Sequence, residues 1–307
     1  MSTVSREGAP EPLALDIDGR TVSALRRRPL APPPRPIADA PEGGPRLLCL
    51  HGWLDNAASF VPLMEHLPHV DVVALDLPGH GASDALETGY SLVEMVYRAR
   101  RAMQCLGWER CHLAGHSLGG CIAPLLAVAD PEAIASLILI EASGPLSERA
   151  EALPERLRRS LAERLDGSRF RSRVFPDLEA AVTARLKAAR MERASARLIV
   201  ERQLEPAEGG WRWRFDPRLR AASPQYQTEA QVRAVLGAVV CPTLTVIATE
   251  GFLAAREDTE ARLAALADRV SLTLPGHHHV HMDTPAPVAA ALNRFLDATP
   301  APDTAAD

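Results

Sequence analysis

The feature that most constrains this chain is the pentapeptide Gly-His-Ser-Leu-Gly at residues 115–119. It follows the apolar run Arg110–Ala114 and precedes a helix-like stretch, so Ser117 stands at a strand-to-helix junction. In that context Gly-x-Ser-x-Gly bends the backbone sharply and exposes its serine as a nucleophile. The five letters alone are a weak signal, and the neighbouring segments give them weight. The sequence therefore predicts Ser117 as a candidate nucleophile.

Short apolar runs alternate with amphipathic stretches from Arg46 onward. Runs that are hydrophobic throughout fit strands buried on both faces, and the stretches between them fit crossover helices. This pattern predicts an α/β fold with a mostly parallel central sheet flanked by helices. The strand candidates are Leu47–Leu50, Val70–Leu75, Cys111–Ala114, Ile134–Ile140, Thr243–Ala248 and Val270–Leu274.

Two features precede this alternation. The runs Leu13–Ile17 and Thr21–Leu25 are separated by Asp18-Gly19, a pair that favours a tight hairpin turn. The segment Pro29–Pro45 is so rich in proline that we expect a stiff surface loop.

The alternation stops between about Pro145 and Val240, where Arg, Glu, Ala and Leu dominate. Apolar residues recur there at helical spacing between charges, which predicts an inserted, mostly helical cap. The expected organisation is a core formed by residues 11–144 and 241–298, with a cap at residues 145–240. Aromatic residues alternate with arginine in Trp211–Leu219, and we interpret them as hydrophobic anchoring rather than as a surface for base stacking.

Composition narrows the classes of function. The 307 residues contain 34 Lys and Arg against 39 Asp and Glu, a net charge of -5, which disfavours nucleic acid or an anionic membrane as partner. No long apolar segment predicts a leader or membrane span, so we expect a cytoplasmic protein that acts on a small molecule. The sequence does not decide whether the chain forms a homodimer, and we expect no cofactor. Five scattered cysteines are interpreted as reduced core residues: Cys49, Cys105, Cys111, Cys121 and Cys241.

A serine needs a histidine base and an acid that orients it. Four histidines, at positions 277, 278, 279 and 281, follow the last strand candidate. Here the chain resembles the α/β-hydrolase superfamily, whose members often end with a histidine, an acid five residues later and a proline seven residues later. Asp283 and Pro285 then identify His278 as the base. A metal site in this cluster is disfavoured, because no carboxylate or cysteine has ligand spacing with it.

The same resemblance implies an oxyanion hole. One backbone N–H would come from Leu118, and the other from Trp53 in the turn His51-Gly52-Trp53, which resembles the family's oxyanion turn. The segment Asp76–Ser83 resembles another family turn, and we expect structural roles for its Asp76 and His80.

The acid is the open question, because Gly251 occupies the position where most family members have an aspartate. Some branches place the acid after the strand that precedes the cap, where this chain has Glu141. A carboxylate that ends an apolar run is costly to desolvate unless it is paired, which favours Glu141. Glu250, Asp258 and a dyad without an acid remain the alternatives.

The motifs together resemble the serine hydrolase-like branch of the superfamily. The branch says little about substrate, and our leading hypothesis is a carboxylesterase-type serine hydrolase that cleaves a small, largely apolar ester, with no metal. Chemistry that needs a carboxylate nucleophile, as in dehalogenases and epoxide hydrolases, is disfavoured by Ser117. A perhydrolase, a C–C bond hydrolase and a non-catalytic binding protein are the other readings.

Overall fold

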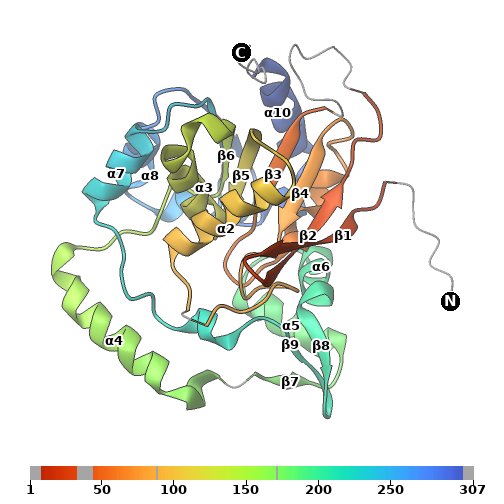
Figure 1. Ribbon diagram of the computed structural model, residues 1–307, viewed down its shortest axis with the longest axis vertical. Coiled ribbons are helices and arrows are strands. Elements are labelled where there is room, and N and C mark those ends of the chain that lie inside the picture. Colours follow the sequence, from red (N-terminus) through yellow and green to blue (C-terminus); the bar gives the residue numbers. More distant parts are fainter. Residues whose placement is uncertain (1–7, 33–43, 88, 171, 300–307) are drawn as a thin grey trace.

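The computed structural model describes residues 8–32, 44–87, 89–170 and 172–299. An eight-stranded sheet has the order β1-β2-β4-β3-β5-β6-β10-β11 (Figure 1). The β1-β2 and β2-β4 pairs are antiparallel and the other pairs are parallel, which confirms the predicted α/β class. The strands of this sheet are β1 (Glu11–Ile17), β2 (Arg20–Arg27), β3 (Arg46–Leu50), β4 (Asp71–Leu75), β5 (Cys111–His116), β6 (Ile134–Ile140), β10 (Thr243–Ala248) and β11 (Arg269–Leu274).

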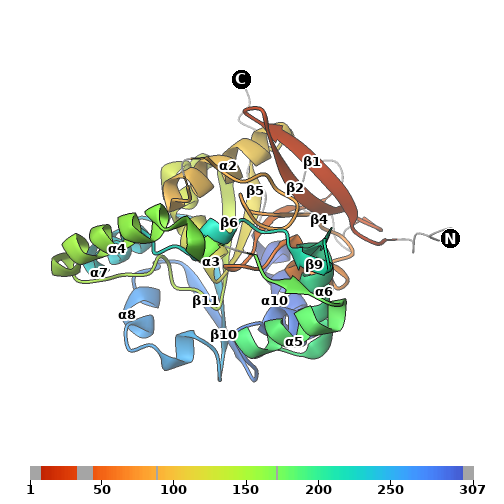
Figure 2. The same ribbon diagram turned by 90° about the horizontal axis from the view of Figure 1, so that it is seen from below.

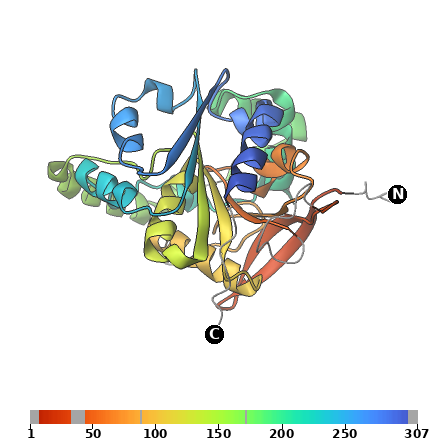
Figure 3. The same ribbon diagram turned by 90° about the horizontal axis from the view of Figure 1, so that it is seen from above.

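Helices cover both faces of the sheet, because alternate residues of a strand point to opposite faces. Leu48 and Leu50 belong to the apolar cluster under α2 and α3, whereas Leu47 and Cys49 belong to the cluster under α1 and α10 (Figure 3). The helices are α1 (Val61–Met64), α2 (Leu92–Cys105), α3 (Leu118–Ala129), α4 (Leu153–Leu165), α5 (Leu178–Ala188), α6 (Arg193–Gln203), α7 (Glu229–Gly237), α8 (Thr259–Leu263), α9 (Val280–Asp283) and α10 (Pro285–Ala298). None of the helices in the described part is long and apolar enough to cross a membrane.

The N-terminal hairpin is confirmed. β1 and β2 pair through a turn in which Asp18 has φ 53° and Gly19 has φ 74°, the left-handed values that a tight hairpin turn of this kind requires. The expected loop at Pro29–Pro45 lies for the most part outside the described residues, since positions 33–43 are not among them.

Two expectations about burial are wrong. β11 is not buried on both faces, because it is the edge strand of the sheet, and Val270 is 56% exposed. Cys105 is also exposed, at the end of α2, whereas the other four cysteines are buried free thiols. Burial raises the pKa of the Cys111 thiol to about 12, so this group is inert at neutral pH.

The inserted segment, which we define as residues 141–242, connects β6 to β10. It contains α4 to α7 and also a three-stranded sheet in the order β7-β9-β8, which the sequence analysis missed. Trp213 packs its ring on Phe175 and Phe215, with centroid distances of 4.9 and 5.9 Å, in agreement with hydrophobic anchoring. The three strands are β7 (Val174–Phe175), β8 (Leu204–Ala207) and β9 (Gly210–Trp213).

Helix α4 lies at the outside of the inserted segment, away from α5 and α6 (Figure 2). Its leucines follow one another at every fourth position and are exposed, from 48% at Leu157 to 60% at Leu161 and 77% at Leu165. The polar Ser160 is buried instead, at 2%. The helical period was therefore predicted correctly, but the apolar side of this helix does not face the core.

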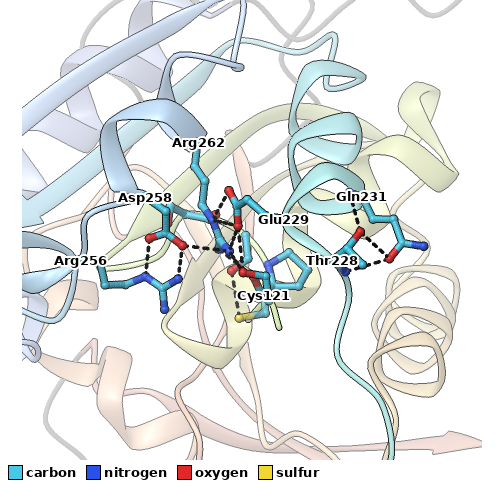
Figure 4. A network of polar contacts seen from close by, with 11 residues as sticks. Cys121, Thr228, Glu229, Gln231, Arg256, Asp258 and Arg262 are labelled. Atoms are coloured by element: carbon cyan, nitrogen blue, oxygen red, sulfur yellow. Dashed lines mark hydrogen bonds and ion pairs between the residues drawn. The ribbon is translucent and has the colours of Figure 1, made fainter. Parts of the chain in front are cut away.

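A buried arginine fastens the two ends of the inserted segment to the core (Figure 4). Arg262 of α8 is 1% exposed and donates to the carbonyl oxygens of Ser143 and Pro145 at 3.3 and 2.8 Å. Its Nη2 also donates to Ser147 Oγ and to Glu229 Oε2, at 2.7 and 2.6 Å. Ser143 to Ser147 lie near the start of the inserted segment and Glu229 starts its last helix, so one guanidinium holds both ends.

Replacement of Arg262 by methionine is expected to lower the free energy of unfolding by about 2 to 4 kcal/mol, because buried acceptors lose their donor. Arg256→Met is the control, since Arg256 also pairs with Asp258 but its side chain is 22% exposed. That control is expected to cost less than about 1 kcal/mol. Urea denaturation followed by circular dichroism measures both values, and equal losses would contradict the special role of Arg262.

Candidate active site

Ser117 stands at a sharp turn between β5 and α3. Its backbone has φ 50° and ψ -108°, a conformation that L-residues rarely adopt and that is found where function requires strain. The Ser117 N–H donates to Ile140 O at 3.1 Å, which fixes the turn to the end of β6. Ser117 is half-buried and lies between the end of β5 and the start of α3, at the carboxyl edge of the sheet.

The glycines of the pentapeptide are explained by close backbone approach. A Cβ on Gly115 would lie 2.4 Å from the carbonyl group of Gly119. A Cβ on Gly119 would lie 1.9 Å from Leu50 O, at the end of β3. Because α3 crosses both strands at these distances, the sequence can form the turn only with glycine at both positions.

The structure brings Glu141 and His278 together. The Nδ1 atom of His278 lies 3.2 Å from Glu141 Oε2, although the two residues are 137 positions apart. Glu141 is completely buried, whereas the His278 side chain is 29% exposed. This arrangement fixes one imidazole nitrogen against a carboxylate and leaves the other for proton transfer.

Backbone N–H groups hold the Glu141 carboxylate in place. Oε1 accepts a hydrogen bond from Ala248 N at 2.7 Å, and Oε2 accepts one from Phe252 N at 2.6 Å. A Cβ on Gly251 would lie only 2.2 Å from Oε2. The carboxylate of Glu141 therefore fills the space into which a side chain at position 251 would project, and this explains the glycine there.

The two alternative acids form ion pairs with arginines. Glu250 is exposed and pairs with Arg190 at 3.2 Å. Asp258 pairs with Arg256 and, at 3.2 Å, with Arg262 (Figure 4). Of the three carboxylates considered from the sequence, only Glu141 has a hydrogen bond to His278 among the described residues.

His278 contacts His116, the residue that precedes the serine. The Nε2–H of His116 donates to His278 O at 2.9 Å, and the two ring centroids are 4.8 Å apart. Among the described side chains there is no direct hydrogen bond between Ser117 Oγ and the His278 ring. Catalytic contacts are often long in the free enzyme and tighten in the substrate complex.

Of the two expected oxyanion donors, Leu118 directly follows the serine and Trp53 lies in the turn after β3. Leu118 is the first residue of α3, and an N–H at this position has no acceptor within its own helix. Trp53 follows β3, and its indole donates to Leu219 O of the inserted segment at 3.0 Å. Its ring is 52% exposed, so its apolar face is available to a ligand.

Asp76 and His80 have structural positions, as the sequence analysis expects. Asp76 accepts from Ala57 N and Ala82 N at 2.8 and 2.9 Å, and pairs with Arg202 of α6 at 2.7 Å. It therefore fixes two core loops and fastens the inserted segment to them. Burial lowers the pKa of His80 to about 3, so this imidazole is neutral.

Sequence reasoning missed a second polar group behind the serine. Asp55 lies 3.2 Å from His279 Nε2 and pairs with Arg185 of α5. Burial raises the pKa of its carboxyl, but Arg185 and His279 lower this pKa more strongly, to well below the usual range. Burial and the neighbouring histidines hold the pKa of His116 well below its ordinary value. The ionised Asp55 thus faces the neutral imidazole of His116.

Acid is expected to unfold the protein through its buried histidines. Burial lowers the pKa of His281 to about 3 and that of His112 to about 4, whereas an unfolded histidine titrates near 6.5. The unfolded chain then binds protons that the folded chain does not, so stability is full above the unfolded pKa and falls as the pH is lowered. Each such histidine costs about 2 kcal/mol between pH 7 and 5.

Urea denaturation at several pH values tests this expectation. His281→Leu should reduce the loss of stability between pH 7 and 5 by about 2 kcal/mol, because one proton-linked group is removed. The exposed His66 supplies the control, and His66→Gln should leave the pH dependence unchanged. If the free energy of unfolding of His281→Leu depends on pH in the same way as that of the wild type, His281 does not contribute to the acid sensitivity.

The sequence profile of the alpha/beta hydrolase fold matches residues 45–285, most of the chain. The chain belongs to the alpha/beta hydrolase family. This alpha/beta hydrolase is 30% identical over 279 residues to serine hydrolase-like protein 2 of Homo sapiens, with 83% of this chain and 88% of the relative covered. It is 27% identical over 273 residues to a serine hydrolase-like protein of Danio rerio, with 83% and 82% covered.

Solved structures agree with this assignment. The crystal structure of the hypothetical protein PA1622 from Pseudomonas aeruginosa PAO1 matches this alpha/beta hydrolase with a TM-score of 0.83 at 35% identity. The match covers 94% of this chain and 98% of that one. The protein is thus a hydrolase of the serine hydrolase-like branch, the branch that its motifs indicate.

Proposed function

We propose that this alpha/beta hydrolase cleaves a small, largely apolar carboxylic ester through an acyl-enzyme formed on Ser117. The observation that carries the proposal is the contact of His278 Nδ1 with the buried Glu141, next to a serine held in a strained turn. Such a carboxylate keeps the imidazole in the tautomer that accepts the serine proton, and stabilises the imidazolium that forms.

The reaction proceeds in two steps in this proposal. Ser117 Oγ attacks the ester carbonyl while His278 Nε2 takes its proton, and the N–H groups of Leu118 and Trp53 stabilise the oxyanion. His278 then gives the proton to the leaving alcohol. In the second step His278 activates water, which releases the acid and restores the serine.

The surroundings of the site favour an apolar substrate. The Trp53 ring is 52% exposed and that of Phe252 is 45% exposed, and Phe252 contacts the His278 ring with a centroid distance of 5.9 Å. The inserted segment serves as the cap in this proposal, since α6 and the loop at Leu219 bind the core loops around the serine. A non-catalytic binding protein is disfavoured, because Glu141 occupies the place of the acid that is missing at position 251.

Turnover and active-site labelling test the proposal. The purified chain should hydrolyse p-nitrophenyl acetate and butyrate, with a burst of nitrophenol as the acyl-enzyme forms, and should react with a fluorophosphonate probe. Mass spectrometry should place the probe on Ser117. Labelling without ester turnover would favour perhydrolase or C–C bond chemistry on the same residues, and no labelling would favour a binding protein.

A further inference from the structure

Three buried polar side chains near Ser117 carry out no proton transfer or bond change in the proposed reaction. Asp55 follows β3, His116 precedes the serine and His279 follows the base, and all three are at most 3% exposed. One carboxylate oxygen and one nitrogen from each imidazole lie within 4.8 Å of one another. We call these three residues the Asp-His-His cluster.

The hydrogen bonding of His116 leaves a lone pair aimed at this cluster. Its Nε2 bonds a carbonyl oxygen, His278 O, so the proton of the neutral ring is on Nε2 and Nδ1 is a bare acceptor. Nδ1 is buried and has no hydrogen-bond partner, and it lies 3.7 Å from Asp55 Oδ2, which is another acceptor. Two acceptors that face each other in a buried place are stabilised by a cation between them.

The spacing suits a transition metal. Asp55 Oδ2 is 3.2 Å from His279 Nε2 and 3.7 Å from His116 Nδ1. In a tetrahedral site with bonds of about 2.0 to 2.1 Å, neighbouring ligands are about 3.3 Å apart. Glycine at position 52 keeps the space beside this pair open, because a Cβ there would lie 2.9 Å from both Asp55 Oδ2 and His116 Nδ1.

We propose that the Asp-His-His cluster binds one divalent transition-metal ion of the Zn²⁺ type. Two imidazoles and one carboxylate form a ligand set that suits zinc and its neighbours better than calcium or magnesium. From the sequence, a metal site is disfavoured because no carboxylate has ligand spacing with these histidines. In the fold Asp55 supplies that carboxylate, although it is 224 positions from His279.

Arg185 competes with this ion. Its guanidinium pairs with Asp55 Oδ1, and its Nη2 lies 3.5 Å from His279 Nε2. A metal bound at Oδ2 therefore repels a cation a few ångströms away, and Arg185 has to withdraw for tight binding. Since Arg185 belongs to α5, metal binding weakens one of the contacts that fasten the inserted segment to the core.

Direct metal binding tests the proposal without any measurement of turnover. The full chain is freed of metal with a chelator and titrated with ZnCl₂ by calorimetry, and CoCl₂ binding is followed by its visible spectrum. We expect one ion per chain, and an intense cobalt spectrum that indicates four-coordinate geometry. Asp55→Asn and His279→Gln should each weaken binding by at least about 100-fold, more than loss of an outer-shell partner does.

Two further variants separate this site from a surface histidine. Arg185→Met should tighten binding by at least about tenfold, because a competing cation is removed. His277→Gln should leave it unchanged, since His277 lies beside Glu250, outside the cluster. No binding by the wild type, a weak cobalt spectrum, or binding that survives Asp55→Asn would overturn the proposal. If His279→Gln does not unfold cooperatively, Asp55→Asn and Arg185→Met decide the question.

Discussion

Ser117→Ala is expected to lower kcat/KM for p-nitrophenyl butyrate by about 10⁵- to 10⁶-fold, the scale on which serine hydrolases depend on their nucleophile. The oxyanion donors and the histidine remain, but no group can form the acyl-enzyme, so the nitrophenol burst and the fluorophosphonate label should both disappear. The strained turn is fixed by the close approach of Gly115 and Gly119, so the fold should persist.

Ser136→Ala is the matched control for this variant. Ser136 is a buried serine of β6 whose hydroxyl bonds His112 at 2.8 Å, near the opposite end of the strand. Its variant should keep both the burst and the label. Residual burst kinetics in Ser117→Ala, or a probe found on another residue, would show that the nucleophile has been assigned incorrectly.

The sequence allowed most of the sheet to be predicted because its strands are continuous apolar runs. Ile134–Ile140 is entirely buried, and β6 has the predicted bounds. The runs do not reveal strand order, however, and β11 is exposed because only one neighbour pairs with it. The short strand β9 was missed because Trp211 and Trp213 alternate with arginine over too few residues to give a clear period.

Periodicity also does not specify what a helix packs against. The leucines of α4 have helical spacing, and a helix formed there, yet Leu161 and Leu165 are exposed. The inward side of α4 is polar, and Arg156 of that helix pairs with Glu148 in the segment before it. A local pattern thus predicts the element, whereas its orientation depends on residues that are distant in the chain.

The same limit applies to the site. Ser117 and the position of His278 follow from local motifs, and Glu141 follows from the cost of a carboxylate at the end of an apolar run. Asp55 has no such signal, because its partners His279 and Arg185 come from segments far away in the sequence. An acidic residue after an oxyanion turn, with several late histidines, is the pattern that could have suggested the contact.

Glu141→Gln is expected to lower kcat by about 10³- to 10⁴-fold, because loss of the orienting carboxylate lets the imidazole take the wrong tautomer. Glu250→Gln should change kcat by less than about threefold, since that side chain is 59% exposed and pairs with Arg190. Steady-state kinetics with p-nitrophenyl butyrate measures both. A large loss in Glu250→Gln together with a small one in Glu141→Gln would reverse the assignment.

The space shared by Glu141 and position 251 permits a stricter experiment, in which the acid is moved. Gly251→Asp alone should be inactive or poorly folded, because its Cβ would lie 2.2 Å from Glu141 Oε2. Combined with Glu141→Ala, the new aspartate can enter the vacated space, where Phe252 N and Ala248 N donate to a carboxylate and His278 Nδ1 is within reach. The double variant should therefore be at least about tenfold more active than Glu141→Ala alone, a coupling that neighbouring residues show and independent ones do not. Additive losses in the two variants would mean that position 251 cannot supply the acid, and that Gly251 serves only to make room for Glu141.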